Sequence, residues 1–256
     1  MANTVFNNKV IEAKAKDLLL TSVNARSLMS IDTELAENAG MVKSINTYTY
    51  TGTAEEVENG EGNTERGQIS HVTNDYTVKM VQQAFDYTDE DFMKDNTIVD
   101  NMLKGANQVM VNKMTSDFIA ELGKATLSQT GVFGYDTIVD AISKLNVEDE
   151  SNLFVVIPNT WKADLRKDED YKTARMGEVI YNGQVGAIAG IPVIATKALT
   201  DAAYVMSKEA VKLFMKKDVE VEPSRDADKR KNSYYLRTAY VCALVDATQI
   251  AKITRA

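Results

Sequence analysis

The chain has 256 residues, of which 44% are hydrophobic and 26% are charged, and its formal net charge is −8. This charge argues against DNA or RNA as a tight partner, because nucleic-acid binding rests mainly on neutralisation of phosphates by Lys and Arg. The single cysteine, Cys242, excludes a disulfide within the chain. No signal peptide is visible and no apolar run approaches the ~20 residues that span a bilayer, so we expect a soluble protein made in the cytoplasm.

The first part of the chain is interpreted as an arm. An amphipathic stretch places Val10, Ile11, Leu18 and Leu19 on one face, and irregular chain follows it. Nothing before residue 40 has the size or pattern of an independent domain.

A long hairpin with an acidic tip is predicted next. Its arms alternate in the manner of strands over roughly Ile45–Thr53 and Ile69–Tyr87. One base, Arg66, stands in the tip against five glutamates, which are Glu55, Glu56, Glu58, Glu61 and Glu65. A hairpin of two strands is marginal in water, because both edges are unpaired and one face at most can pack. Two interpretations follow: a mobile solvated loop, or a loop that lies on another molecule.

A single long helix is predicted over Asp89–Leu122. Thr88 and Asp91 have the spacing of a capping box at its start. The apolar stripe consists of Val99, Met102, Ala106, Val109, Met110, Met114 and Phe118. A continuous helix of this length would extend roughly 50 Å, more than the ~45 Å diameter of a compact globule of this chain. An elongated molecule is therefore expected.

Short alternating elements indicate an α/β lobe over residues 128–206. We expect helices at Tyr135–Asn146 and Asn159–Lys167, with the buried strand Asn152–Pro158 between them. Trp161 is interpreted as a core residue. Two long strands then flank a charged turn, "RDADKRK" (Arg225–Lys231). This turn is either simply solvated or part of an ion-pair network between subunits, through Arg225, Asp226, Asp228, Lys229, Arg230 and Lys231.

No catalytic, cofactor or metal site is predicted. The only histidine, His71, lies in the hairpin, a poor place for the dry, pre-organised site that a catalytic triad needs. One His and one Cys do not make a zinc site of the usual kind. Gly183, Gly186 and Gly190 match neither the dinucleotide fingerprint nor a P-loop. A catalytic carboxylate pair stays open, since 37 Asp and Glu residues are present.

The order of these parts resembles the major capsid proteins of tailed bacteriophages, which have the Hong Kong 97-type fold. The resemblance covers nearly the whole chain and is carried by the succession of elements together with two stretches, "GQVGAIAGIPVIAT" (Gly183–Thr196) and "YYLRTAYVCALVDATQIAKI" (Tyr234–Ile253). It implies an α+β fold made of the following parts: an N-terminal arm (1–35), an extended hairpin or E-loop (44–80), a peripheral or P domain (36–43, 81–127 and 207–256) with a spine helix (89–125), and an axial or A domain (128–206).

The resemblance also implies a function. The chain would be a structural protein that self-assembles into hexamers and pentamers of an icosahedral or prolate head. The head would enclose double-stranded DNA without binding it tightly. The virion would be its location, after assembly in the host bacterial cytoplasm, and a separate scaffolding protein, a portal and decoration proteins would be possible partners. The E-loop would lie on an adjacent subunit through Tyr50, the five glutamates and Arg66.

One departure from the family pattern bears on how subunits are joined. Some relatives link subunits by an isopeptide bond from an E-loop lysine, and no lysine lies between Thr51 and Asn74 here, so we expect a non-covalent shell. Two alternatives remain from the sequence: the shell of an encapsulin-like nanocompartment, which has the same fold, and a carboxylate-dependent hydrolase.

Overall fold

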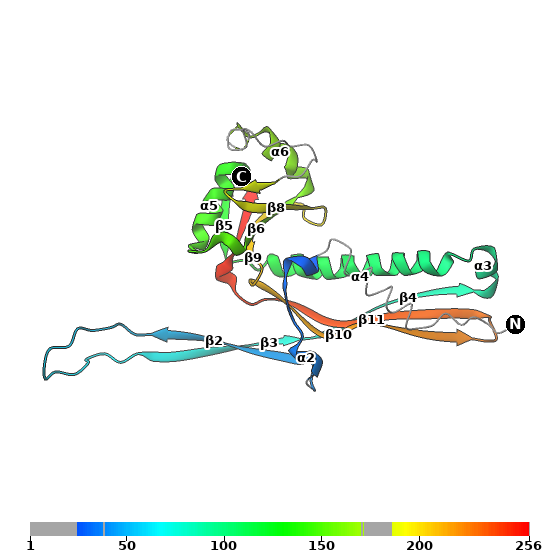
Figure 1. The fold of residues 1–256 in the computed structure, drawn as a ribbon, viewed down its shortest axis with the longest axis horizontal. Coiled ribbons are helices and arrows are strands. Elements are labelled where there is room, and N and C mark those ends of the chain that lie inside the picture. Colours follow the sequence, from blue (N-terminus) through cyan, green and yellow to red (C-terminus); the bar gives the residue numbers. More distant parts are fainter. Residues whose placement is uncertain (1–24, 38, 170, 172–185, 256) are drawn as a thin grey trace.

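A computed structural model describes residues 25–37, 39–169, 171 and 186–255. The expected helix around Val10–Leu19 and the glycine at 183 lie outside these residues. Figure 1 shows an elongated molecule in which a two-stranded hairpin projects beyond the body. The body consists of a sheet with one long helix along it and a second, smaller lobe on the far side of that helix.

The elements alternate between strands and helices along the chain. The strands are β1 (Ser30–Asp32), β2 (Val42–Thr51), β3 (Gln68–Thr77), β4 (Lys79–Thr88), β5 (Leu127–Gly131), β6 (Leu153–Pro158), β7 (Ala187–Ile188), β8 (Ile191–Thr196), β9 (Ala202–Ser207), β10 (Val211–Asp226), β11 (Lys231–Leu244) and β12 (Ile250–Arg255). The helices are α2 (Glu34–Glu37), α3 (Asp89–Lys94), α4 (Ile98–Leu122), α5 (Tyr135–Leu145) and α6 (Lys162–Lys167). Short 3-10 turns are η1 (Ala25–Leu28), η2 (Glu150–Asn152), η3 (Asn159–Trp161) and η4 (Ala247–Gln249).

A four-stranded sheet with the order β1-β10-β11-β4 forms the base of the body. The antiparallel pair β10–β11 turns at the charged segment, as the sequence predicted. The helix α4 lies along one face of this sheet (Figure 1) and packs on it through apolar side chains such as Leu103, Val111 and Leu236. Burial of these side chains is the main force that holds helix and sheet together.

The predicted single helix is two helices, so its expected length of roughly 50 Å is wrong. The capping box is confirmed: Thr88 Oγ1 accepts a hydrogen bond from the Asp91 amide at 3.2 Å, and the Asp91 carboxylate accepts from the Thr88 amide at 3.2 Å. The helix α3 ends after one and a half turns because the Asp95 carboxylate bonds the amide and hydroxyl of Thr97, at 2.8 and 2.7 Å. The helix α4 begins at Ile98 and is about 37 Å long at 1.5 Å per residue.

The buried face of α4 agrees with the predicted stripe except at one position. Val99, Ala106, Met110, Met114 and Phe118 are buried as predicted and Met102 is half-buried, whereas Val109 is 50% exposed. The helix also buries Leu103, Asn107, Val111 and Leu122, which the stripe did not include. The stripe was drawn too far round the helix, because Val109 and Met110 are 100° apart and only one of them faces the sheet.

The second lobe is a six-stranded sheet with the order β5-β12-β9-β6-β8-β7, covered by α5. Every residue of β6 is buried, and Trp161 is 4% exposed, which confirms it as a core residue. The strand β12 lies between β5 and β9 in this sheet. Its residues were expected in the P domain with the rest of 207–256, and the structure instead places them in the six-stranded sheet, next to its edge strand β5.

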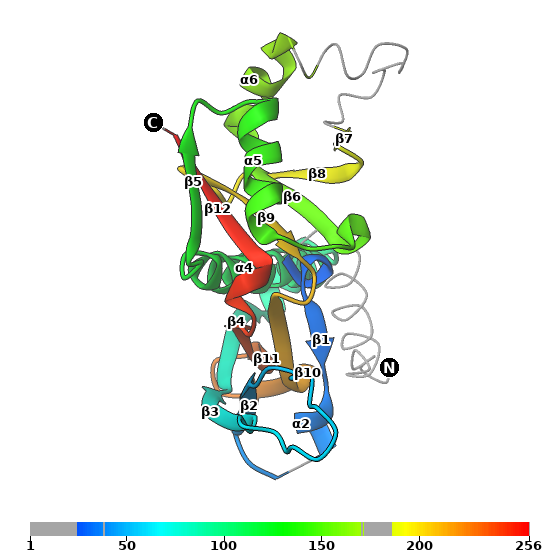
Figure 2. The same cartoon turned by 90° about the vertical axis from the view of Figure 1, so that its left-hand side faces the viewer.

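The hairpin consists of β2 and β3, which pair over ten residues each and with no other described strand. The predicted second arm, Ile69–Tyr87, is two strands that part at Val78. The side chain of Val78 is buried and its amide donates to the Met41 carbonyl at 2.7 Å. The chain thereby leaves the hairpin and enters the four-stranded sheet as β4. Figure 2, which looks at the hairpin end of the molecule, shows the tip in front of that sheet, on the side away from the second lobe.

Candidate assembly surface

One face of the hairpin carries large apolar side chains that none of the residues described by the structure covers. The register pairs Tyr50 with Ile69 and Tyr48 with His71, and alternation along the strands puts these four residues on one face. Tyr48 is 61%, Tyr50 68% and Ile69 69% exposed. Such a concentration of exposed apolar surface on a solvated protein is typical of an interaction site.

The tip, residues 52–67, is held by its own acidic side chains. The Glu55 carboxylate accepts from the Thr64 hydroxyl at 2.6 Å, from the Thr64 amide at 2.9 Å and from the Glu65 amide at 3.3 Å. These hydrogen bonds, that of the Thr64 hydroxyl first, lower the pKa of Glu55 below its usual value. The Glu65 carboxylate accepts from the Thr53 hydroxyl at 3.4 Å.

The other charged side chains of the tip are candidates for contact with another molecule. Within the part of the chain that the structure describes, the carboxylates of Glu56, Glu58 and Glu61 and the guanidinium of Arg66 have no hydrogen-bond or ion-pair partner. Glu55 and Glu65 thus form hydrogen bonds within the loop. The carboxylates of the other three glutamates are available for contact with another molecule.

The Tyr50 ring lies close to the backbone of Gly52 and Gly67, where the two strands of the hairpin meet the tip (the neck of the tip). A Cβ atom on Gly67 would lie 1.9 Å from the Tyr50 hydroxyl, and one on Gly52 would lie 2.8 Å from the Gly67 Cα atom. Glycine at both positions therefore allows the Tyr50 ring to lie across the neck. A shallow cavity of about 330 Å³ opens beside it, lined by Thr51, Gly52, Thr53, Glu65, Arg66 and Gln68.

The charged turn between β10 and β11 forms its ion pairs inside the chain. Each cation has an acidic partner: Arg225 with Asp89 at 2.9 Å, Arg230 with Glu90 at 3.3 Å, Lys231 with Asp86 at 2.6 Å and Lys229 with Asp226 at 3.8 Å. The Lys231 ammonium lowers the pKa of Asp86. The Asp226 carboxylate also accepts from the Asp228 amide at 3.1 Å. An ion-pair network thus exists here, and it fastens the turn to β4 and to the first turn of α3.

The hairpin tip and the charged turn lie at opposite ends of the molecule (Figure 1). The sequence named both as sites of contact between subunits, and one chain does not bring them together. A contact between the two sites therefore requires two copies of the chain.

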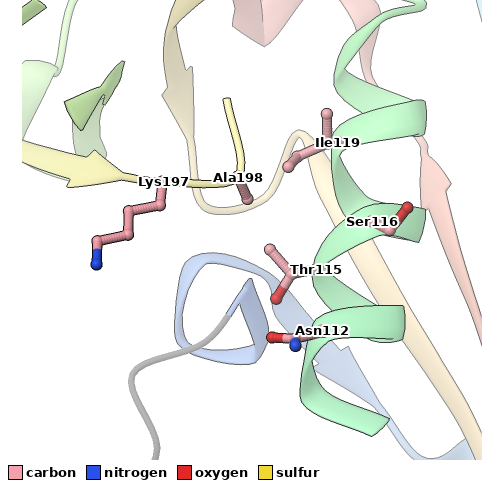
Figure 3. A pocket seen from close by; sticks show the side chains of 6 residues that line it. All are labelled: Asn112, Thr115, Ser116, Ile119, Lys197 and Ala198. Carbon is pink, nitrogen blue, oxygen red and sulfur yellow. The ribbon is translucent and has the colours of Figure 1, made fainter. Parts of the chain in front are cut away.

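A second cavity of about 360 Å³ lies where α4 meets the segment after β8 (Figure 3). It is lined by Asn112, Thr115, Ser116, Ile119, Lys197 and Ala198. Thr115 and Ile119 extend from α4 toward Ala198, whereas Ser116 points away (Figure 3). No acid, histidine or cysteine lines this cavity.

His71 and Cys242 are the only histidine and cysteine of the chain, and neither lies in surroundings that suit catalysis. His71 is exposed and its ring lies 5.9 Å from that of Tyr48. Cys242 is buried, and burial raises the pKa of its thiol to about 12, which makes it unreactive at neutral pH. Among residues 25–37, 39–169, 171 and 186–255, no three His, Cys, Asp or Glu side chains are grouped so as to hold a metal ion. None of the described helices is long and apolar enough to cross a membrane.

Two contributions to this surface were not visible in the sequence pattern. Alternation indicated that Tyr48 and Tyr50 share a face, but only the register shows that Ile69 joins them. The role of Thr64 as the donor that holds Glu55 was also missed. In the sequence, this hydrogen bond is indicated only by a hydroxyl residue that stands opposite a glutamate across a glycine-rich tip. That pattern is common and therefore a weak indication.

Comparison with known proteins gives a consistent result. No protein-family model matches the chain. The major capsid protein of Staphylococcus phage phiMR11 is 24% identical over 236 residues, which are 90% of this chain and 86% of that protein. The capsid of the cyanophage P-SCSP1u superposes with a TM-score of 0.72 at 11% identity, over 90% of this chain and 86% of that one. The virus-like particle from Pyrococcus furiosus superposes with a TM-score of 0.67 at 10% identity, over 97% of this chain and all of that one. The chain therefore has the capsid fold of tailed bacteriophages, the Hong Kong 97-type fold.

Proposed function

We propose that the chain is a major capsid protein, a structural subunit that assembles with copies of itself into the head of a tailed phage. The observation that carries this is the projecting hairpin, whose apolar face is two-thirds exposed in the single chain. Full burial of a large apolar side chain contributes ~1.5–3 kcal/mol. Covering Tyr48, Tyr50 and Ile69 on a neighbour would thus contribute several kcal/mol per contact, which offsets part of the cost of association.

The proposed function assigns a role to each part of the fold. The hairpin β2–β3 is the E-loop, α4 is the spine helix, the four-stranded sheet is the core of the P domain and the six-stranded lobe is the A domain. The E-loop lies on a neighbouring subunit, with Tyr50 on its apolar face and Glu56, Glu58, Glu61 and Arg66 at its tip.

The charged turn is the candidate partner of the tip by charge alone. Its cations Arg225, Lys229, Arg230 and Lys231 already have acidic partners in their own chain. A neighbouring tip would share these cations with those acids rather than meet free charges. Exposed shared pairs of this kind contribute little each, so the apolar face is expected to supply most of the contact energy.

We further propose that the shell consists of hexamers and pentamers and encloses double-stranded DNA. The net charge of −8 favours confinement of the DNA over tight binding to the subunits. A scaffolding protein, a portal and decoration proteins are partners that a phage head of this design would use. Because the relative in sequence is a phage capsid protein, the phage head is preferred to a nanocompartment shell.

The test is the state of the purified protein. Negative-stain microscopy and light scattering across salt and protein concentration are expected to show capsomers or closed shells. A protein that stays monomeric under all these conditions would overturn the proposal. Shells that contain a co-purified enzyme instead of DNA would favour the nanocompartment.

A further inference from the structure

The hairpin contacts the body at its root, where Ile45 and Tyr76 pack against a buried cluster of the four-stranded sheet and Lys43 forms ion pairs. Lys43, the second residue of β2, lies opposite Tyr76 of β3. The Lys43 ammonium is in contact with the Glu34 carboxylate and lies 3.8 Å from the Asp32 carboxylate. Its side chain is 21% exposed.

The two acids that hold Lys43 are fixed to the four-stranded sheet. Asp32 ends β1, which pairs in parallel with β10. Leu35, next to Glu34, is buried against that sheet, and its carbonyl accepts from the Lys216 ammonium at 2.7 Å. Asp32 also accepts from the Glu34 amide at 2.9 Å. Movement of the hairpin therefore does not carry these acids with it.

Tyr76 anchors the other strand at the same level. Its hydroxyl donates to the Leu244 carbonyl at 3.3 Å, and its ring stacks on Phe214 with centroids 5.6 Å apart. One cross-strand pair thus reaches the body on two sides: Lys43 contacts the segment β1–α2, and Tyr76 contacts the last residue of β11 and a buried ring of β10.

Beyond this pair and Ile45 the hairpin is a lever. The strand continues from Asn46 to Thr51, roughly 20 Å at 3.3 Å per residue, before the tip begins. A tilt of about 10° at the root would displace the end of the strands by about 3.5 Å. Such a displacement is large compared with the precision that a packed interface requires.

We propose that Lys43 and Tyr76 form a brace that sets the direction of the hairpin, and that they are positioning residues for its contact with a neighbouring subunit. This inference rests on the proposed assembly function. Lys43 acts through its ion pairs to the fixed acids Asp32 and Glu34. Tyr76 acts through its hydroxyl and its ring.

The direction of the hairpin is measured by single-molecule energy transfer on unassembled protein, at concentrations where copies do not associate. Dyes are attached at Asn63→Cys in the tip and Ser116→Cys on α4, and the buried Cys242 is spared. The variants are Lys43→Met, Lys43→Arg and Tyr76→Phe. The control is Lys79→Met, which removes an exposed lysine at the start of β4. Thermal unfolding verifies that each variant is folded.

The brace predicts a broader or shifted distance distribution in Lys43→Met and, to a smaller extent, in Tyr76→Phe. Lys43→Arg and the control should match the parent. High salt should broaden the parent distribution but leave Lys43→Met unchanged, because the ion pairs are already absent there. A Lys43→Met distribution identical to that of the parent would overturn the brace, whatever the shells look like.

Assembly of the same variants separates the inference from the function on which it rests. A loosened hairpin together with shells of mixed size supports both. A loosened hairpin with uniform, normal shells would show that hairpin direction does not govern assembly. That result would overturn the positioning role and count against the hairpin as the main contact, while the brace itself would stand.

Discussion

Removal of the hairpin tip is expected to separate folding from assembly. The change replaces residues 52–67 by Asn-Gly, so that the facing residues Thr51 and Gln68 are joined by a two-residue turn. The tip is exposed throughout apart from a half-buried Glu55 and contributes nothing to the core. Its loss should therefore cost no burial energy.

The expected change in stability follows from the loop length. Shortening the loop from sixteen residues to two removes three doublings of length at ~0.6 kcal/mol each, so the free energy of unfolding should rise by at most about 2 kcal/mol. Phe118→Ala on α4 is the reference for real core damage, and it should lower the same quantity by ~3–5 kcal/mol. Denaturant unfolding of unassembled protein measures both.

Light scattering and microscopy then measure assembly of the shortened protein, which is expected to fail or give fragile particles. A second variant keeps the tip length and changes Glu56, Glu58 and Glu61 to Gln, so that it isolates the effect of charge. Normal shells from the shortened protein would refute the reasoning, because the tip would then be only a solvated loop. A loss of stability beyond about 1 kcal/mol would refute the claim that the tip is outside the core.

The remaining predictions concern single residues and the charge of the shell. Gly105→Ala should stabilise the folded chain by about 1 kcal/mol, since the position is helical with open space around it; no rise in the denaturation midpoint would contradict this. Asn107→Leu should also stabilise, by ~1–3 kcal/mol, because its amide is buried with neither nitrogen nor oxygen hydrogen-bonded; a lower midpoint would indicate a partner such as bound water. The hydrogen bonds of Glu55 should be complete above its ordinary pKa of 4.5 and be lost as pH falls through its lowered value. The amide shift of Thr64, followed by NMR, should report a midpoint below 4.5, and a midpoint at or above 4.5 would refute it. Empty shells should show no binding to duplex DNA at about 0.15 M salt, where the Debye length is ~8 Å; sub-micromolar binding in a gel-shift titration would contradict the confinement proposal.

Local patterns in the sequence predicted much of the fold. The capping box at Thr88, the buried strand β6 and the helix α5 were all predicted, because each depends on residues that are neighbours in the chain. The projecting hairpin followed from a tip with no apolar residue between Val57 and Ile69. These features need no knowledge of distant contacts.

The misjudged features depend on competition or on distant partners. The break between α3 and α4 arises because the Asp95 side chain competes with the helix for the Thr97 amide. The spacing of apolar residues carries no information about such competition. The place of β12 depends on pairing with β5, more than 100 residues earlier. For the candidate site, composition located the acidic tip. Hydrogen bonds across the loop decide which glutamates remain available for contact with another molecule, and composition does not show these bonds.

The place of β12 has a consequence for how the protein is made. This strand joins β5 to the rest of its sheet through β9, so a chain that has not been synthesised to residue 255 leaves β5 unpaired and β9 with an open edge. The lobe is then incomplete while the ribosome is still translating, although most of its residues have already emerged. Nascent and truncated chains would thus be unable to present a finished surface to their neighbours. Only copies translated through β12 would enter an assembly, and a single late strand would serve as a quality check on every subunit.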